Sequence, residues 1–169
     1  MMISKKMAKA INEQVTNEFN AYWIYQQMAF SFETMGFKVF SQWFVAQATE
    51  ERGHAEKMAK YLLDQGADVQ LLSLAKPQAE FKTVADVIQG ALDHELKVTK
   101  QINALMDIAV TEKDHASAQF LQWFVQEQVE EVATAKELLD LVKKAKTDDQ
   151  ILLLESRIMA LRGPAGPKA

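Results

Sequence analysis

Four predicted helices each carry one glutamate in the middle of an otherwise apolar stripe. The stripes follow alternating steps of three and four residues, the spacing that keeps side chains on one helical face. Apolar and aromatic residues fill every stripe except near its centre, where the carboxylates are Glu18, Glu51, Glu95 and Glu131. His54 follows Glu51 by three residues, so it shares that face and can reach the same ion. These residue types at this spacing predict a metal site inside a helical bundle.

The polar groups of the four stripes also lie at one height in the predicted bundle. Glu18 and His54 lie equally far along the chain from Gly36, one on each side of the turn expected there. Glu95 and Gln128 flank a second expected turn, near residue 112, at almost equal separations. Because a helix rises ~1.5 Å per residue, these groups and the neighbouring stripe glutamates all lie ~22–29 Å from a turn and meet near mid-bundle.

Burial of four carboxylates at one height requires nearby positive charge. Each ion loses several kcal/mol of hydration in a protein interior, and like charges raise one another's pKa. No Lys or Arg lies on any of the four stripes. Two divalent cations would balance the four charges, and oxygen donors with one imidazole suit iron or manganese. A single glutamate on a stripe usually marks its solvated edge, but four in register favour a di-metal site over a purely structural bundle.

The composition excludes several other kinds of site. The chain has 169 residues, enough for one domain with a sizeable core. It has no cysteine, which excludes disulfides, thiolate nucleophiles and iron–sulfur clusters. A net charge of −4 argues against a nucleic-acid partner. The sequence shows no signal-peptide pattern and no apolar run near the ~18 residues of a membrane span, so we expect a cytoplasmic protein without a membrane partner.

Five helical segments are predicted to position the site. Gly36 and Gly66 are the expected ends of the first two helices. Thr83 and Asp86 resemble a capping box at the start of the third helix, and Asp114 is the expected cap of the fourth. The predicted helices span residues 5–35, 37–65, 84–110, 114–144 and 148–162, and a Gly/Pro tail at 163–169 should fray, all within one domain of residues 1–169.

The connections predict how the helices are arranged. Short turns join the first helix to the second and the third to the fourth, so each pair should form an antiparallel hairpin. About 17 residues, 67–83, separate the hairpins, more than the ~2–8 residues usual between bundle helices. Fully extended, this segment reaches ~56 Å, longer than the ~45 Å of a 30-residue helix. It can therefore run the length of the bundle, which makes the second and third helices parallel.

Other polar and aromatic residues have simpler interpretations when taken alone. Gln42-Trp-Phe-Val45 recurs as Gln122-Trp-Phe-Val125, and a Glu-Glu pair follows each copy at the same spacing. By themselves, the glutamates beside the stripes are best interpreted as solvated-face residues; they are Glu50, Glu127 and Glu130. The aromatic residues expected to pack in the core are Tyr22, Tyr25, Trp43 and Trp123. The two remaining histidines, His94 and His115, are expected at the surface.

The motifs together resemble those of the prokaryotic non-haem ferritins over nearly the whole chain. The resemblance is carried by four segments: Asn12-Glu-Gln14, Tyr25-Gln-Gln-Met28, Glu50-Glu51-x-x-His54, and Phe120-Leu-Gln-Trp123 followed by Glu127-Gln-x-Glu-Glu131. It implies an all-α, ferritin-like four-helix bundle with one long crossover and a short fifth helix at the C-terminal side. It also implies two bound irons. The first iron would be held by Glu18, Glu51 and His54. Glu51 would bridge to the second iron, which Glu95 and Glu131 would also bind.

The resemblance further implies roles for the residues around the two irons. Gln128 would hydrogen-bond to bound oxygen species or water, and Tyr25 would lie beside the site as an electron donor. The residues that match the family's third iron site, with Glu131 shared, are Glu50, Glu127 and Glu130. The implied function is ferroxidase activity and iron storage: Fe(II) is oxidised in pairs by O2 or peroxide, and ferric mineral is stored inside a hollow shell of 24 identical subunits. No haem is expected.

Related proteins fit less well. Bacterioferritins place a haem-binding methionine between the ligand glutamate and histidine, where this chain has Arg52. Bundles with two Glu-x-x-His motifs, such as bacterioferritins and rubrerythrins, need a histidine where Glu131 stands. A soluble di-iron carboxylate oxidase or peroxidase without mineral storage would use the same ligands, so it stays open as the alternative.

Overall fold

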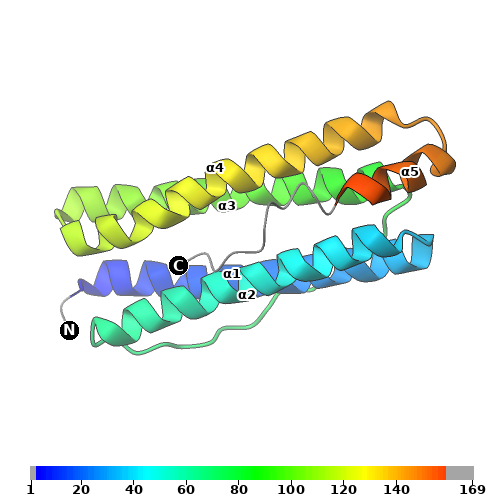
Figure 1. The fold of residues 1–169 in the computed structure, drawn as a ribbon. Coiled ribbons are helices and arrows are strands. Elements are labelled where there is room, and N and C mark those ends of the chain that lie inside the picture. The colour runs from blue at the N-terminus through cyan, green and yellow to red at the C-terminus, as the bar shows by residue number, and fades with distance from the viewer. Residues whose placement is uncertain (1–2, 159–169) are drawn as a thin grey trace.

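The computed structural model describes residues 3–158, which form five α-helices and no strand (Figure 1). The helices are α1 (Lys5–Met35), α2 (Lys38–Asp64), α3 (Val84–Glu112), α4 (His115–Lys144) and α5 (Asp148–Ile158). The third helix runs beyond its predicted end at 110, and Asp114 lies just outside α4 as its N-cap. The predicted end of the fifth helix at 162 and the tail at 163–169 lie outside the described residues.

Local capping chemistry fixes most of the helix ends. The Ser4 hydroxyl accepts the Met7 N–H at 3.0 Å and begins α1, and Gly36 ends it in the left-handed region at φ 89°. Thr83 and Asp86 form the predicted capping box: each side chain accepts the other's backbone N–H, at 3.1 and 3.0 Å. Short-range sequence signals therefore set where the hairpin helices begin and turn.

The start of α2 is capped from elsewhere in the chain. Phe37, its N-cap, makes no side-chain capping hydrogen bond. Instead Glu155 of α5 accepts the backbone N–H groups of Val39 and Phe40 at 2.8 and 3.2 Å. A carboxylate at a helix N-terminus is favoured by the helix dipole as well as by these hydrogen bonds. The fifth helix is thus tied to the bundle at the α1–α2 turn.

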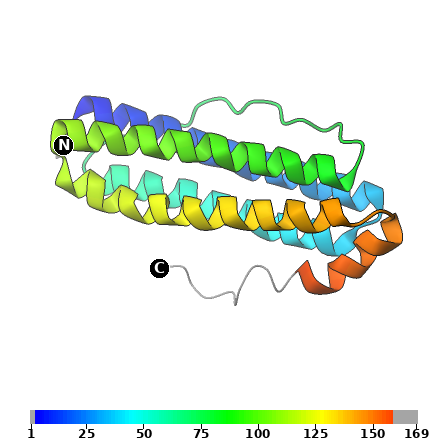
Figure 2. The ribbon, with the colours of Figure 1, turned by 90° about the horizontal axis from the view of Figure 1, so that it is seen from above.

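The crossover between α2 and α3 lies along the outside of the bundle (Figures 1 and 2). Asn12 of α1 exchanges two hydrogen bonds of 2.8 Å with the backbone of Gln70, and Asn20 accepts the Ala75 N–H at 3.1 Å. The crossover therefore follows α1 back along the bundle, and α2 and α3 run parallel, as the length of the segment predicts. This is the expected four-helix bundle with one long crossover.

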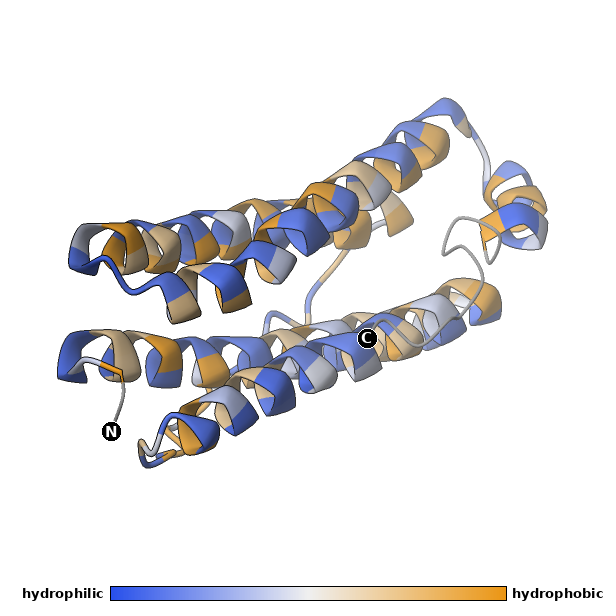
Figure 3. Ribbon diagram, turned by 60° about the vertical axis from the view of Figure 1, so that its left-hand side comes forward, coloured by the Kyte–Doolittle hydropathy of each residue, from blue (hydrophilic) through white to orange (hydrophobic). Residues whose placement is uncertain are grey.

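Two apolar clusters fill the bundle and leave a polar layer between them. One cluster lies towards the α1–α2 turn and includes Phe32, Phe40 and Phe44; the other lies towards the opposite end and includes Met7 and Met58. Every helix carries both apolar and polar residues (Figure 3). Among the described residues, no helix is long and apolar enough to cross a membrane. The four glutamates of the stripes lie between the two clusters.

Candidate metal centre

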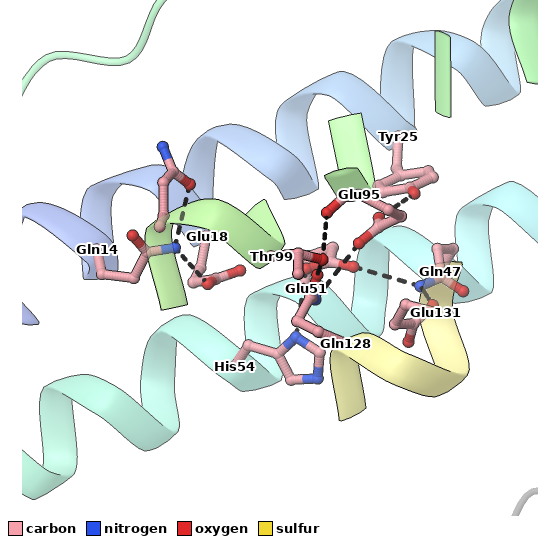
Figure 4. Close-up of polar contacts among 11 residues, drawn as sticks. Gln14, Glu18, Tyr25, Gln47, Glu51, His54, Glu95, Thr99, Gln128 and Glu131 are labelled. Carbon is pink, nitrogen blue, oxygen red and sulfur yellow. Dashed lines mark hydrogen bonds and ion pairs between the residues drawn. The ribbon is translucent and has the colours of Figure 1, made fainter. Parts of the chain in front are cut away.

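Four helices each place one glutamate in the polar layer between the two apolar clusters (Figure 4). Glu18 of α1, Glu51 of α2 and Glu95 of α3 are each only 1% exposed, and Glu131 of α4 is 7% exposed. All four are therefore removed from bulk water, as their positions on the apolar stripes predict. The structure brings the predicted carboxylates into one layer, with the oxygen-rich chemistry that hard divalent cations prefer.

The α1–α2 hairpin holds a compact group of donor atoms. Glu18, Glu51 and His54 each offer one ligand atom, and these atoms lie within 4.8 Å of one another. His54 Nδ1 is 3.3 Å from Glu51 Oε2. The imidazole is held by edge-on contacts with the rings of Trp123 and Phe124, at centroid distances of 5.4 and 5.9 Å. One cation could be bound by this group without a large rearrangement.

Glu95 and Glu131 lie outside that compact group and are held by other partners. The Tyr25 hydroxyl donates a hydrogen bond to Glu95, and Gln128 donates to the other carboxylate oxygen at 3.4 Å. The Thr99 hydroxyl in turn donates to Gln128 Oε1 at 2.9 Å. Gln128 and Tyr25 therefore both contact Glu95 directly.

Two buried glutamines supply amide donors that the sequence analysis did not assign. Gln14 Nε2 donates to Glu18 at 2.8 Å. Gln47 Nε2 donates to Glu51 at 3.3 Å and, across the bundle, to Glu131 at 2.7 Å. Each glutamine precedes a stripe glutamate by four residues. This repeated Gln-x-x-x-Glu spacing puts donor and acceptor on one helical face and is the signal that could have revealed them.

Burial raises the pKa of three of the glutamates to about 8. It is the largest cause for Glu18, Glu51 and Glu95, and the charges of neighbouring carboxylates raise each pKa further. The hydrogen bonds from the glutamine side chains act in the opposite direction but are weaker effects. In the metal-free chain these carboxyls therefore hold protons at neutral pH. Divalent cations would displace those protons and stabilise the ionised forms.

The predicted third-site glutamates differ in exposure. Glu127 is buried, Glu50 is half-buried and Glu130 is exposed. Within the described part of the chain, Glu18, Glu51 and His54 are the group whose donor atoms lie close enough together to bind one metal ion. The predicted third-site glutamates do not belong to this group. The three glutamates run from the buried layer to the surface and do not form a compact cluster.

His94 is half-buried, not exposed at the surface as expected. Its ring lies edge-on to Tyr25 at a centroid distance of 5.9 Å, and its Nε2 is buried without a hydrogen-bond partner. Burial lowers the pKa of His94 to about 4, so the ring is neutral. His94 immediately precedes Glu95, and each residue turns a helix by ~100°. His94 therefore lies off the apolar stripe, on the side of α3 that contacts Tyr25 of α1. His115 is exposed, as predicted.

The aromatic residues near the site pack largely as predicted. Tyr25 and Trp43 are buried in the cluster towards the α1–α2 turn, and Tyr22 packs against it. Trp123 is only half-buried. The ammonium group of Lys57 lies 3.5 Å from the centre of the Trp123 ring, a cation–π contact on the face of the bundle beside His54.

Comparison with known proteins agrees with this geometry. The Ferritin-like domain family matches residues 8–145. A bacterial non-heme ferritin of Bacteroides fragilis is 40% identical over 157 residues, covering 93% of this chain and 98% of that protein. A bacterial non-heme ferritin of Staphylococcus aureus is 31% identical over 161 residues, covering 95% and 97%.

Solved structures show the same relationship. An open pore ferritin from the archaeon Archaeoglobus fulgidus superposes with a TM-score of 0.91 at 35% identity, over 95% of this chain and 99% of that one. An engineered closed form of the A. fulgidus ferritin gives a TM-score of 0.90 over 94% of this chain. With a buried carboxylate layer at the centre of the matched bundle, the chain belongs to the ferritins, which oxidise Fe(II) and store the iron.

Proposed function

We propose that this ferritin oxidises Fe(II) in pairs at the buried carboxylate layer. The first iron would bind to Glu18, Glu51 and His54, whose ligand atoms already lie within 4.8 Å of one another. Glu51 would bridge to a second iron bound by Glu95 and Glu131. The observation that carries this assignment is the burial of four carboxylates in one layer, because two divalent cations compensate their charge.

Pairing suits the chemistry of the oxidant. Each Fe(II) gives one electron, so two adjacent irons reduce O2 to hydrogen peroxide, or hydrogen peroxide to water, with two protons taken up in each case. Gln128 and Tyr25 lie on the Glu95 side of the layer. Gln128 would orient a bound oxygen species or water, and Tyr25 would supply an electron when one iron is missing.

The third iron would bind between the site and the surface. We assign the third iron to the three glutamates beside the stripes, Glu50, Glu127 and Glu130. Glu131 would be shared between the second and third irons. Their graded exposure supports a route along which oxidised iron leaves the layer. This assignment gives two irons at the oxidation site and one beyond it.

Storage requires that many chains enclose a cavity, and we propose a shell of 24 copies in the cytoplasm. Large apolar side chains remain exposed on the described surface of a single chain, among them Trp23 and Phe30 of α1 and Leu71 of the crossover. Such side chains commonly mark interfaces.

No haem is expected in this protein. The alternative function is that of a di-iron oxidase that does not store iron.

Sizing combined with iron chemistry tests the proposal. The protein should elute with the combined mass of 24 chains, each of 19.1 kDa. Aerobic Fe(II) should turn it amber and load hundreds of irons per particle without precipitation. A small oligomer that oxidises Fe(II) but retains only about two irons per chain would favour the alternative. A small oligomer without iron oxidation would overturn both.

A further inference from the structure

Gln47 joins two carboxylates that belong to different hairpins. It lies on α2 and is 3% exposed. Its single amide nitrogen is 3.3 Å from Glu51 Oε1 on the same helix and 2.7 Å from Glu131 Oε2 on α4 (Figure 4). Both N–H groups of the amide are thereby used. This link between the hairpins does not involve a cation.

The chemistry of an amide fits this position better than that of its alternatives. A glutamate would add a fifth carboxyl to a layer in which burial already raises the pKa of Glu51. An apolar residue would leave two buried acceptors without this donor, which costs free energy. In the internal repeat of the two Gln-Trp-Phe-Val segments, the residue that corresponds to Gln47 is Glu127. The two hairpins therefore differ at this position, with an amide in one and a carboxylate in the other.

Gln14 provides an internal comparison. It precedes Glu18 by four residues, as Gln47 precedes Glu51, and it donates to Glu18 at 2.8 Å. Its other contacts are with Gln101 at 3.4 Å and Asn17 at 3.2 Å, away from Glu131. Gln14 thus supports a ligand of the first iron alone, whereas Gln47 also reaches a ligand of the second.

We propose that Gln47 is a positioning residue that holds Glu131 ready for the second metal ion. This inference rests on the proposed assignment of the two irons. Glu131 is the ligand that α4 contributes, and it lies outside the compact donor group of the α1–α2 hairpin. The 2.7 Å hydrogen bond to Gln47 directs its carboxylate towards Glu51, the proposed bridge. Without that bond the Glu131 side chain gains rotamers, and binding of the second ion must then restrict them.

The test compares Gln47→Met with Gln14→Met, two substitutions that keep an unbranched side chain and remove the amide. The probe is Co(II), titrated anaerobically into the assembled metal-free protein and followed by calorimetry and by its visible absorption. Wild type should bind two ions in the layer in resolved steps. Q47M should weaken the second step by about 10–100-fold, the usual effect of removing a partner of a metal ligand. The first step should weaken less, because the hydrogen bond from Gln47 to Glu51 is the longer of the two, at 3.3 Å against 2.7 Å. Q14M should weaken the first step instead.

The outcomes separate the inference from the proposed function. Fewer than two Co(II) ions in the layer of the wild-type protein would overturn the assignment of the site itself. A second outcome is that the wild type binds two ions but that the two binding steps of Q47M are unchanged or weakened equally. That result would overturn the role of Gln47 alone, because a general packing defect weakens both steps to the same extent. If Q47M does not assemble, Gln47→Asn keeps an amide but withdraws it by one methylene, and the same selective loss is expected.

Discussion

The buried carboxyls store protons when no metal is bound. Glu18, Glu51 and Glu95 have pKa values raised to about 8, chiefly by burial. Glutamine amides and a tyrosine hydroxyl, which are neutral donors, hydrogen-bond to them, and His54 also lies 3.3 Å from Glu51. Ionisation without a cation would place several negative charges in one apolar layer. Iron uptake at the proposed site would therefore exchange protons for metal, and its affinity should depend on pH.

Stability of the metal-free protein should fall as pH rises from about 5 through 8. A carboxyl whose pKa is raised on folding binds its proton more tightly in the folded than in the unfolded state. The unfolding free energy therefore decreases between the unfolded value of 4.5 and the folded value of about 8. The unfolding midpoint of the protein, measured at pH 6 and pH 8.5 in the presence of a chelator, should be lower at pH 8.5. The difference between the two midpoints should become smaller when Zn(II) replaces the chelator. A midpoint that rises over this interval would contradict the pKa direction.

Substitution of Glu95 by alanine should slow iron oxidation while the protein still assembles. Glu95 is a proposed ligand of the second iron alone, so the first ion should still bind. Loss of one ligand should lower the initial oxidation rate by at least about 10-fold. Asp93→Ala is the matched control, because Asp93 is an exposed carboxylate on the same helix. Stopped-flow absorbance measures the rate, and an E95A protein as fast as wild type would refute the site assignment.

At the scale of the helices, the sequence predicts structure correctly where the signal is local. Gly36 and the Thr83 capping box depend on backbone conformation and on contacts within a single helical turn, and the described helix ends lie close to their predicted positions. Stripe periodicity identifies which side chains face inward. It does not reveal contacts between helices, which is why it misses the link from Gln47 to Glu131 and the burial of His94 against Tyr25. The cap that Glu155 gives to α2 escapes prediction for the same reason.

Two glycine substitutions should have opposite effects on stability. Gly36 lies at φ 89° with open space around it, so Gly36→Ala adds strain without a clash and should destabilise each chain by about 1 kcal/mol. Gly53 lies inside α2, is exposed and also has open space, so Gly53→Ala should stabilise by about 0.5–1 kcal/mol. Scanning calorimetry of the metal-free proteins measures both shifts. Shifts of the same sign would show that helix conformation does not govern them.

At the scale of the whole molecule, one face of α1 is apolar although it lies outside the core. Trp23 and Phe30 are two helical turns apart, hence on one face, and are 47% and 57% exposed in the single chain. Leu71, Leu72 and Leu74 of the crossover, the segment that hydrogen-bonds to α1, are exposed as well. A surface of this kind is expected to be covered when chains associate.

Phe30→Arg should therefore shift the protein from the proposed shell to smaller species without unfolding the subunit. An arginine in an apolar interface has no partner for its charge, and desolvating it is costly. Sedimentation velocity measures the size, and circular dichroism should show retained helix. Phe30→Leu is the control, since it keeps the surface apolar and should still assemble. A fully assembled F30R protein would show that this face is not an interface.

The long crossover has a consequence for how the active site comes into existence. It leaves each hairpin with two of the four stripe glutamates, Glu18 and Glu51 in one and Glu95 and Glu131 in the other. With the proposed ligands, neither hairpin alone could hold the pair of irons. If the two irons bind as proposed, competence to oxidise iron in pairs requires the docked tertiary structure of both hairpins.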